Sequence, residues 1–255
     1  MKHKIEQIID YDFLIKNNTS TYIFNPIFDT IDSTNTYIEN NSKLLKNKSV
    51  ILTRHQTNGR GRYERNFVSN INKGIYCSFL IKENIDQSFL KLLHLKIACA
   101  LHNAIKITFN IDTQIKWPND LILQNKKCAG ILIETQYNQN KLDSIIIGFG
   151  LNIYKQVFNQ SLNLLAVSLE DVYEQDYNQN QLLINFFETI DEFLYKIDAI
   201  EYFRNHMIPT GTLVTITLDK SKKTVKIINL NSDGQLIVET ENKNIVTLFN
   251  EEIIL

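Results

Sequence analysis

Several residue types are scarce in this sequence of 255 residues, and each scarcity excludes a class of protein. The three cysteines, Cys77, Cys99 and Cys128, lie far apart in apolar runs, which indicates reduced, buried thiols rather than a disulfide framework. No cysteine or histidine spacing suggests a zinc site. No stretch approaches the roughly 18 consecutive apolar residues of a membrane span, and residues 1–10 lack the apolar core of a signal peptide. We therefore expect a cytoplasmic protein that does not contact membranes.

A strong net charge is also absent. The formal net charge is -1, so no global field points to nucleic acid. Arginine is rare, but four of the five arginines fall between Arg54 and Arg65, and the other is Arg204. Six of the eight glycines lie between Gly59 and Gly150. Because the rigid fork of an arginine suits carboxylates and phosphates, this concentration predicts an anion-binding segment.

The pattern of apolar residues predicts an α+β fold, with a mixed or mostly antiparallel sheet and several helices. After Pro209, short β-rich runs alternate with turns such as Ser232-Asp233-Gly234, which predicts a small β-barrel. We expect a lead-in over residues 1–24, a main domain over 25–208 and the barrel over 209–255. Expected strands of the main domain are Pro26–Ile31, Ser49–Thr53, Gly74–Ile81, Ile115–Trp117, Leu121–Leu123, Ala129–Glu134 and Leu142–Ile153; expected helices start at Asp32 or Ser33 and at Asp86, and lie near Leu164–Tyr173 and Gln181–His206.

The segment Gln56-Thr57-Asn58-Gly59-Arg60-Gly61-Arg62 carries the strongest chemical signal. Glycines let backbone N–H groups approach an anion closely, and the arginines add charge-assisted hydrogen bonds. Such a loop suits a carboxylate and a phosphate that must be brought together, because two anions repel unless positive charge surrounds both. A solvated basic loop or an RNA-contacting loop explains the spacing about equally well.

A second segment, Lys116-Trp117-Pro118-Asn119-Asp120, contains the only tryptophan and is followed by Asn125-Lys126-Lys127-Cys128-Ala129-Gly130. Pro118 stiffens the turn and would hold Asn119 and Asp120 in fixed directions. An asparagine can read an adenine edge, an aspartate can help to hold Mg²⁺, and Lys127 is a mobile cation. By itself the segment is better explained by a β-turn beside an exposed charged hairpin, with Trp117 in the core.

Two further polar segments have simple structural explanations. Asp32-Ser33-Thr34-Asn35 is typical of a helix cap, although the same side chains can clamp the polar head of a small ligand. Gly148-Phe149-Gly150-Leu151-Asn152 is typical of a bulged strand, although its glycines can also form a wall where the backbone meets a ligand.

The order and separation of these segments are more specific than any one of them. The series Ser33–Asn35, Gln56–Arg62, Lys116–Asp120, Lys127–Glu134 and Gly148–Asn152 resembles the catalytic domain of bacterial biotin–protein ligases, and the tail resembles their C-terminal SH3-like barrel. The likeness covers about residues 25–255. It implies a class II synthetase-like catalytic domain that joins biotin to a carrier protein, with Mg-ATP as cosubstrate and no prosthetic group.

The resemblance also implies roles for individual residues. Lys127 and Arg62 would be the catalytic residues, with Lys127 bridging the biotin carboxylate and the α-phosphate. Asp120 would lie near Mg²⁺. The implied biotin-binding residues are Ser33, Thr34, Asn35, Gln56, Gly59, Arg60, Gly61, Arg62, Lys127, Gly130 and Gly148; the implied ATP-binding residues are Arg60, Arg62, Lys116, Trp117, Asn119, Lys127 and Asn152.

The chain departs from the family in the continuation of the glycine-arginine segment. The family usually continues Gly-Arg-Gly-Arg-x-Gly-Arg-x-Trp, whereas Glu64 stands here in place of a glycine and Phe67 in place of the tryptophan. A glutamate does not easily adopt the positive φ that is open to glycine, so the path of the loop is expected to differ. Phe67 can still supply an apolar cover.

The implied partner is a biotin carboxyl carrier protein, a subunit of acetyl-CoA carboxylase, and the chain would be a monomer or a weak homodimer. Residues 1–24 are too few for a winged helix-turn-helix domain, so we expect no sequence-specific DNA binding. Two alternatives stay open from sequence. One is a lipoate or octanoate ligase of the same fold, which should have a less polar pocket; the other is a non-catalytic biotin- or nucleic-acid-binding module.

Overall fold

The computed structural model describes residues 7–82, 87–158, 165–218, 221–249 and 251–255, and the remaining residues are not considered further. Its main part is a seven-stranded sheet with the order β1-β2-β3-β7-β6-β5-β4. Only β1 and β2 pair in parallel; every other pair is antiparallel. The strands are β1 Ile23–Phe24, β2 Ser49–Thr53, β3 Gly74–Ile81, β4 Gln114–Lys116, β5 Asp120–Leu123, β6 Lys126–Asn138 and β7 Lys141–Asn152.

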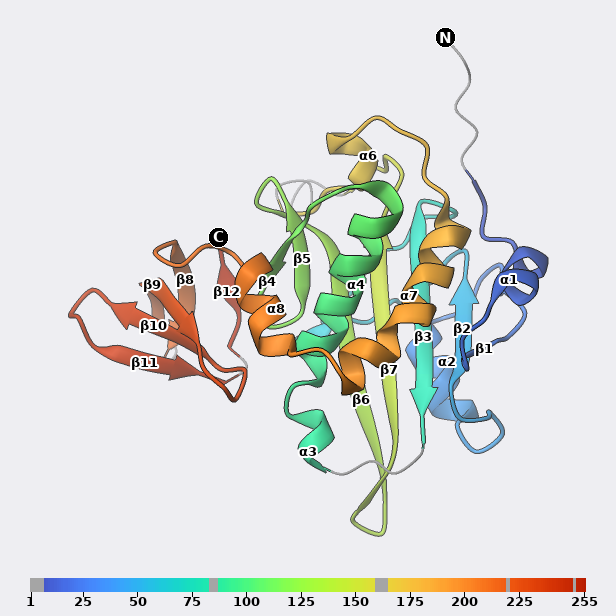
Figure 1. Cartoon of the computed structure of the whole chain (residues 1–255), viewed down its shortest axis with the longest axis horizontal. Helices are drawn as coiled ribbons and strands as arrows, with labels where there is room; N and C mark the ends of the chain where they lie inside the picture. Colours follow the sequence, from blue (N-terminus) through green and yellow to red (C-terminus); the bar gives the residue numbers. More distant parts are fainter. Residues whose placement is uncertain (1–6, 83–86, 159–164, 219–220, 250) are drawn as a thin grey trace.

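Helices cover both faces of this sheet (Figure 1). On one face lie the two long helices, α4 and α7, which pack against each other. On the other face lies α2, whose Ile38 forms a small apolar cluster with Ile51, Leu80 and Ile146 of three strands. Every residue of β2 and β3 is buried because both faces are covered. The helices are α1 Tyr11–Asn17, α2 Thr34–Asn41, α3 Gln87–Leu90, α4 Leu93–Phe109, α6 Leu169–Val172, α7 Gln179–Tyr195 and α8 Ala199–His206, with a short 3-10 turn at Arg62–Glu64.

Two tight hairpins, one at each end of β6, connect this strand to β5 and to β7. Gln124 and Asn125, between β5 and β6, have φ of 48° and 62°, and Gln139 and Asn140, between β6 and β7, have φ of 48° and 63°. Two consecutive residues with positive φ match the twist of antiparallel strands, which explains the asparagines there. The first hairpin pairs Asp120 with Gly130 and Ile122 with Lys127.

The C-terminal residues form a separate five-stranded antiparallel sheet with the order β11-β10-β9-β8-β12. It docks on the main domain through polar contacts. Trp117 Nε1 donates to the carbonyl of Gly234 at 2.9 Å, and the Arg204 guanidinium donates to the carbonyl of Leu230. The strands are β8 Leu213–Leu218, β9 Ser221–Leu230, β10 Leu236–Thr240, β11 Ile245–Leu248 and β12 Ile253–Ile254.

The structure confirms the α+β class and most of the expected elements, with three corrections. The strand expected at Pro26–Ile31 is wrong: β1 lies earlier, and this stretch has only single bridges, from Phe28 and Ile31. The helix expected over Leu164–Tyr173 is reduced to α6, and Leu164 lies outside the described residues. The single helix expected over Gln181–His206 is two helices, because Asp198 caps a new start at Ala199.

The other expectations are closer to the structure. Ser33 caps α2, as expected, with its hydroxyl accepting from the N–H of Thr36. Asp86, the expected cap of the long helix, lies outside the described residues. The described part of the lead-in over residues 1–24 contains one short helix, α1, capped by Asp10, and also β1, which pairs with β2 in the main sheet. In the described part of the chain, no helix has both the length and the apolar character that crossing a membrane requires.

Candidate active site

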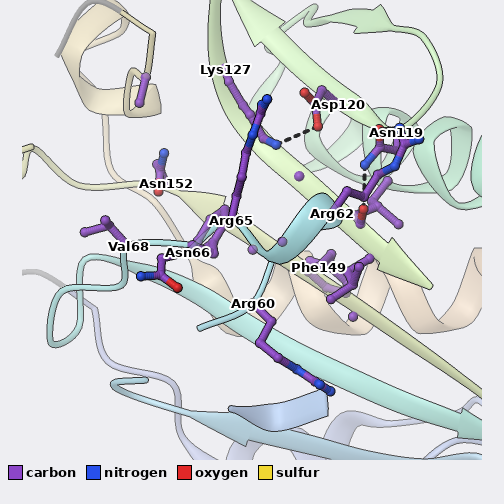
Figure 2. A pocket seen from close by; sticks show the side chains of 18 of the residues that line it. Arg60, Arg62, Arg65, Asn66, Val68, Asn119, Asp120, Lys127, Phe149 and Asn152 are labelled. Carbon is purple, nitrogen blue, oxygen red and sulfur yellow. Dashed lines mark hydrogen bonds and ion pairs between the residues drawn. The ribbon is translucent and has the colours of Figure 1, made fainter. Parts of the chain in front are cut away.

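One cavity of about 510 Å³ gathers almost all of the residues singled out from sequence (Figure 2). It lies where the glycine-arginine loop, the helix α2 and the strands β3, β5, β6 and β7 converge, and the C-terminal strand β12 reaches its rim. Of the predicted site residues, Gly59 alone does not line it. Those that do are Ser33, Thr34, Asn35, Gln56, Arg60, Gly61, Arg62, Lys116, Trp117, Asn119, Asp120, Lys127, Gly130, Gly148 and Asn152.

The glycine-arginine loop is a small hairpin. The N–H of Phe67 donates to the carbonyl of Gly59 at 2.8 Å, and the N–H of Gly61 donates to the carbonyl of Arg65 at 2.7 Å. A Cβ on Gly59 would collide with the carbonyl oxygen of Phe67. Gly59 therefore allows the two arms of the loop to approach each other, although it does not line the cavity.

The loop turns back at Tyr63, which has φ 54° and ψ 42°. The left-handed conformation thus falls on Tyr63, the residue before the one that departs from the family pattern. Phe67 lines the cavity and lies over β7, where a Cβ on Gly150 would collide with its ring. The absence of a side chain at Gly150 is what lets this aromatic cover approach.

The basic end of the cavity is built on two adjacent residues of the second segment. Arg62 Nη1 donates to Asn119 Oδ1 at 3.1 Å, and Lys127 Nζ lies 2.7 Å from Asp120 Oδ1. Asn119 is held in turn by the backbone of Ile131, at 2.7 and 3.0 Å. Two cations from distant parts of the sequence therefore converge beside one turn, and Figure 2 shows both side chains at the same end of the cavity.

Both carboxylate oxygens of Asp120 form ion pairs with lysines. Its Oδ1 meets Lys127, and its Oδ2 lies 3.6 Å from the Nζ of Lys116. The residues that the structure describes contain no group of three or more histidines, cysteines, aspartates or glutamates placed to hold a metal ion. The binding of Mg²⁺ to Asp120 stays a prediction, and these two ion pairs argue against direct contact.

The opposite end of the cavity is a buried, uncharged polar cluster. The backbone N–H of Thr34 donates to Gln56 Oε1 at 2.9 Å. The hydroxyl of Ser78 lies 2.6 Å from Thr34 Oγ1 and 2.5 Å from Asn35 Oδ1. Ser78 is fully buried, and Thr34 and Asn35 are nearly so. Hydroxyl and amide groups held this way suit a neutral ligand group with both donors and acceptors.

Arg60 is directed away from the basic end. Its Nη2 donates to Glu134 Oε2 at 2.8 Å and to Glu39 Oε2 at 3.1 Å. In Figure 2 its guanidinium points away from Lys127 and Arg62. The assignment of Arg60 to the ligand carboxylate and to ATP stays a prediction, which requires Arg60 to leave these two carboxylates.

Two of the residues assigned to ATP binding, Trp117 and Asn152, also make hydrogen bonds to the protein backbone. Trp117 is 2% exposed, and its Nε1–H donates to the carbonyl of Gly234 in the C-terminal sheet. Asn152 Nδ2 donates to the carbonyl of Val167 at 3.3 Å, and its Oδ1 accepts from Gln156 Nε2. Trp117 therefore joins the cavity wall to the C-terminal sheet.

The sequence predicted no site role for four residues that shape the site, Ser78, Glu134, Arg65 and Glu252, although Glu134 ends the Lys127–Glu134 segment. Ser78 is a lone small hydroxyl in the buried strand β3, a signal that could have been read. Arg65 forms a bidentate ion pair with Glu252, with Nη2 2.6 Å from Oε2, and both residues line the cavity. No sequence signal connects residues so far apart.

The described titratable groups offer no activated nucleophile. Burial raises the pKa of the Cys77 thiol, which lines the cavity, and raises the pKa of Cys128 to about 12. Burial, together with the charge of Arg62, lowers the pKa of His94 to about 4. Neutral thiols and an uncharged imidazole suit a site that works by positioning and by charge neutralisation.

Comparison with known proteins agrees with this geometry. A sequence model of the Biotin/lipoate A/B protein ligase family matches residues 27–152. The chain is 26% identical over 213 residues to the bifunctional ligase/repressor BirA of Bacillus subtilis, a match over 80% of this chain and 65% of that protein. It is 30% identical over 125 residues to the biotin--[acetyl-CoA-carboxylase] ligase of Paracoccus denitrificans, a match over 48% of this chain and 51% of that protein.

Solved structures extend the likeness to nearly the whole fold. The biotin protein ligase of Aquifex aeolicus in complex with biotin and ATP superposes with a TM-score of 0.75 at 25% identity, covering 89% of this chain and 96% of that one. The chain nevertheless spans less than two thirds of the length of the first curated relatives that it matches, 65% in one case and 38% in another.

The mixed sheet, the basic loop and the C-terminal β-sheet have the arrangement found in the biotin protein ligase of Aquifex aeolicus. The chain is similar to the biotin/lipoate A/B protein ligase family over residues 27–152.

Proposed function

We propose that the chain is an ATP-dependent biotin–protein ligase. It activates biotin as biotinyl-5′-AMP and transfers the biotinyl group to a lysine of a biotin carboxyl carrier protein. The observation that carries this proposal is the meeting of Arg62 and Lys127 in one cavity that also holds the polar cluster of Thr34, Asn35 and Gln56. A ligand with a polar neutral head and a carboxylate tail fits these two ends.

In the first step, a carboxylate oxygen of biotin attacks the α-phosphorus of ATP. A new C–O–P mixed anhydride forms, the bond between the α-phosphorus and the bridging oxygen breaks, and pyrophosphate leaves. The two reacting groups are both anions, so the role of Arg62 and Lys127 is to neutralise the charge that accumulates between them. Asp120 and Asn119 hold these cations in place before the substrates arrive.

In the second step, the neutral amine of the carrier lysine attacks the carbonyl carbon of the anhydride. The C–N amide bond forms, the C–O bond to the phosphate breaks, AMP leaves, and the surplus proton passes to solvent. No protein nucleophile takes part, in agreement with the raised pKa of the Cys77 thiol. Phe67 lies over the cavity and would restrict the access of water to the anhydride.

Mg²⁺ would neutralise the phosphates of ATP when it enters with the nucleotide. Such an ion is commonly held by substrate phosphates, water and one or two carboxylates. Asp120 already forms ion pairs with two lysines, so its carboxylate is poorly suited to direct coordination of Mg²⁺. The protein groups that act on the phosphates are therefore the cations Arg62 and Lys127.

The polar end of the cavity favours biotin over lipoate. Thr34, Asn35, Ser78 and Gln56 form linked hydrogen bonds within a few ångströms, and a lipoyl ring offers no hydrogen-bonding partner for them. Buried polar groups left without partners by a ligand lower its affinity. Thermal shifts with each acid are expected to show stabilisation by biotin and none by lipoate.

The direct test is a mass measurement. A biotin carrier domain is incubated with the chain, biotin and Mg-ATP, and we expect its mass to rise by one biotinyl group. Release of pyrophosphate from biotin and ATP without the carrier tests the first step alone. A non-catalytic binding module would release no pyrophosphate and would leave the carrier unchanged.

We also propose the division into a lead-in over 1–24, a catalytic domain over 25–208 and an SH3-like barrel over 209–255. The start of β8 at Leu213 and the all-antiparallel sheet after it support the last boundary. The acceptor would be the carrier subunit of acetyl-CoA carboxylase, as the name of the Paracoccus relative suggests. Absence of sequence-specific DNA binding stays a prediction that a gel-shift with a biotin operator at physiological salt tests.

A further inference from the structure

We infer that Tyr63 is a positioning residue, whose phenol holds the guanidinium of Arg62 in the direction in which it meets the two reacting anions. The inference rests on the proposed function only for the reaction that Arg62 serves. Tyr63 lies at the tip of the glycine-arginine loop, lines the cavity and is 58% exposed. Arg62 lines the same cavity, so two residues that are adjacent in sequence direct their side chains to one space.

The backbone conformation of Tyr63 brings these two side chains together. Adjacent side chains of an extended chain point to opposite sides. Tyr63 instead has φ 54° and ψ 42°, and the N–H of Arg65 donates to the carbonyl of Arg62 at 3.2 Å, which closes a turn around it. The left-handed conformation is unfavourable for a residue with a Cβ and persists only where other contacts hold it. A strained residue at the mouth of the cavity points to a role for its side chain.

Tyr63 makes two contacts with the guanidinium of Arg62. Arg62 Nη2 donates to the phenol oxygen at 3.0 Å. The guanidinium carbon lies 4.9 Å from the centre of the aromatic ring, within the range of a cation–π contact. The hydrogen bond directs one arm of the guanidinium, and the ring supports the group from one side.

The other arm of the guanidinium has a buried anchor. Arg62 Nη1 donates to Asn119 Oδ1 at 3.1 Å, and Asn119 is only 6% exposed and is itself held by the backbone of Ile131. A group held by one hydrogen bond can swing about that bond, whereas hydrogen bonds on both arms fix the plane of the guanidinium fork. Tyr63 therefore supplies the second anchor, at the exposed side of the cavity.

These two anchors direct Arg62 without cancelling its charge. An amide oxygen and a phenol oxygen are neutral acceptors, whereas Lys127 is held by the carboxylate of Asp120. A guanidinium has five N–H groups, so both anchors can persist while the group also donates to an anion. Donors already aimed at the developing charge need no reorganisation during the reaction. Tyr63 should therefore act on the chemical step more than on the capture of substrates.

The decisive variant is Tyr63→Phe, which keeps the ring and removes the hydroxyl. We expect kcat for pyrophosphate release from biotin and ATP to fall about fivefold, with the KM values little changed. The matched control is Tyr137→Phe, because Tyr137 is also largely exposed, at 53%, and lies on β6 outside the lining of the cavity. The control should keep the wild-type rate, and an unchanged kcat in Tyr63→Phe overturns the inference.

The variant Tyr63→Gly separates positioning from a structural role. Glycine adopts the left-handed conformation without the penalty of a Cβ, so the melting temperature should stay close to that of the wild type. The value of kcat should fall further than in Tyr63→Phe, because the ring contact is lost together with the hydrogen bond. A wild-type kcat in Tyr63→Gly would contradict the positioning role.

The effect should also pass through Arg62. In a chain that carries Arg62→Ala, the addition of Tyr63→Phe should cause no further loss of kcat, since the group that the phenol directs is gone. A further loss of the same size would mean that the phenol acts on the substrates directly, and the inference would be wrong.

A readout without catalysis separates this inference from the proposed function. The chain has five arginines, so the guanidinium signals of isotope-labelled arginine can be assigned by NMR with single variants. We expect slow rotation of the Arg62 guanidinium in the wild-type chain without substrates and faster rotation in Tyr63→Phe. Equal rotation in the two chains overturns the inference. A wild-type chain that showed this difference but released no pyrophosphate would refute the proposed function alone.

Discussion

Lys127 Nζ lies 2.7 Å from Asp120 Oδ1, although the two residues come from opposite strands of the β5–β6 hairpin, and Lys116 shares the same carboxylate. This arrangement holds the ammonium group of Lys127 next to the place where the α-phosphate and the biotin carboxylate would meet. When those anions enter, Lys127 can exchange Asp120 for the substrates without a change of fold. The site is thereby positively charged before substrates bind, which lowers the reorganisation needed for reaction.

Replacement of Lys127 by alanine should slow the formation of biotinyl-5′-AMP by about 10²- to 10³-fold, the usual effect of removing one group that stabilises a developing charge. Pyrophosphate release in the absence of carrier measures this step. The control is Lys126→Ala, the neighbouring lysine on the same hairpin, which does not line the cavity and should keep the wild-type rate. Equal rates in the two variants would refute the role of Lys127.

Replacement of Gly130 by alanine should move Lys127 without unfolding the domain. A Cβ at this position would lie 2.5 Å from Lys127 Cε and 2.6 Å from its Nζ, and a flexible lysine end can shift. We expect kcat for adenylate formation to fall about tenfold while the melting temperature stays nearly constant. Because the effect acts through Lys127, it should vanish when Gly130→Ala is added to Lys127→Ala. An additional loss in the double variant would contradict this explanation.

Replacement of Glu252 by glutamine should loosen the glycine-arginine loop. The bidentate pair between Arg65 and Glu252 fastens this loop to the C-terminal sheet, and Glu252 holds the pKa of Arg65 above its usual value, chiefly through the hydrogen bond. The pair is largely solvent-exposed, so the stability should change by less than about 1 kcal/mol. The release of preformed biotinyl-5′-AMP should be several-fold faster.

Glu239→Gln is the matched control for that experiment, since it breaks an ion pair with Lys226 within the C-terminal sheet and away from the cavity. It should release the adenylate at the wild-type rate. A wild-type release rate in Glu252→Gln would show that the pair does not hold the loop. Arg62→Gly should also raise free biotinyl-5′-AMP, because it removes a cation from the cavity itself.

The stability of the fold should decrease at acidic pH because of His102. This imidazole is fully buried, with Nδ1 2.9 Å from the hydroxyl of Tyr202 and Nε2 3.2 Å from Asp112 Oδ1. Burial, followed by the charge of His206, lowers its pKa from 6.5 to about 4. The unfolded chain therefore binds this proton first, and stability is lost as the pH falls from 6.5 towards 4, with a slope approaching about 1.4 kcal/mol per pH unit.

Urea unfolding at pH 7.5, 6 and 5 measures this slope. The variant His102→Gln cannot take up the proton and should show a flatter dependence of the unfolding free energy on pH over this range. The comparison of slopes, and not of absolute stabilities, is the readout, because the substitution also alters two hydrogen bonds. Identical slopes in the two proteins would assign the acid sensitivity to other groups.

Local patterns predicted most of the elements. The apolar run Gly74–Ile81 became β3, the cap at Ser33 started α2, and the turn residues Gln124 and Asn125 closed the β5–β6 hairpin. The predicted elements that were wrong lie where the local sequence pattern also fits another structure. The stretch Pro26–Ile31 has strand-forming residues but forms only isolated bridges, and the apolar period of Gln181–His206 continues through the break at Asp198.

The sequence by itself determined which chemical groups the site contains, because arginine, glycine and the Lys116–Asp120 segment are set apart by their rarity and order. The tertiary structure decided which of them act together. It placed Lys127 and Arg62 at one end of the cavity, turned Arg60 towards Glu134, and brought Ser78 and Glu252 from distant segments into the site. The reason is that side-chain direction depends on sheet register and on the docking of the C-terminal sheet, and both are set by contacts between residues far apart in sequence.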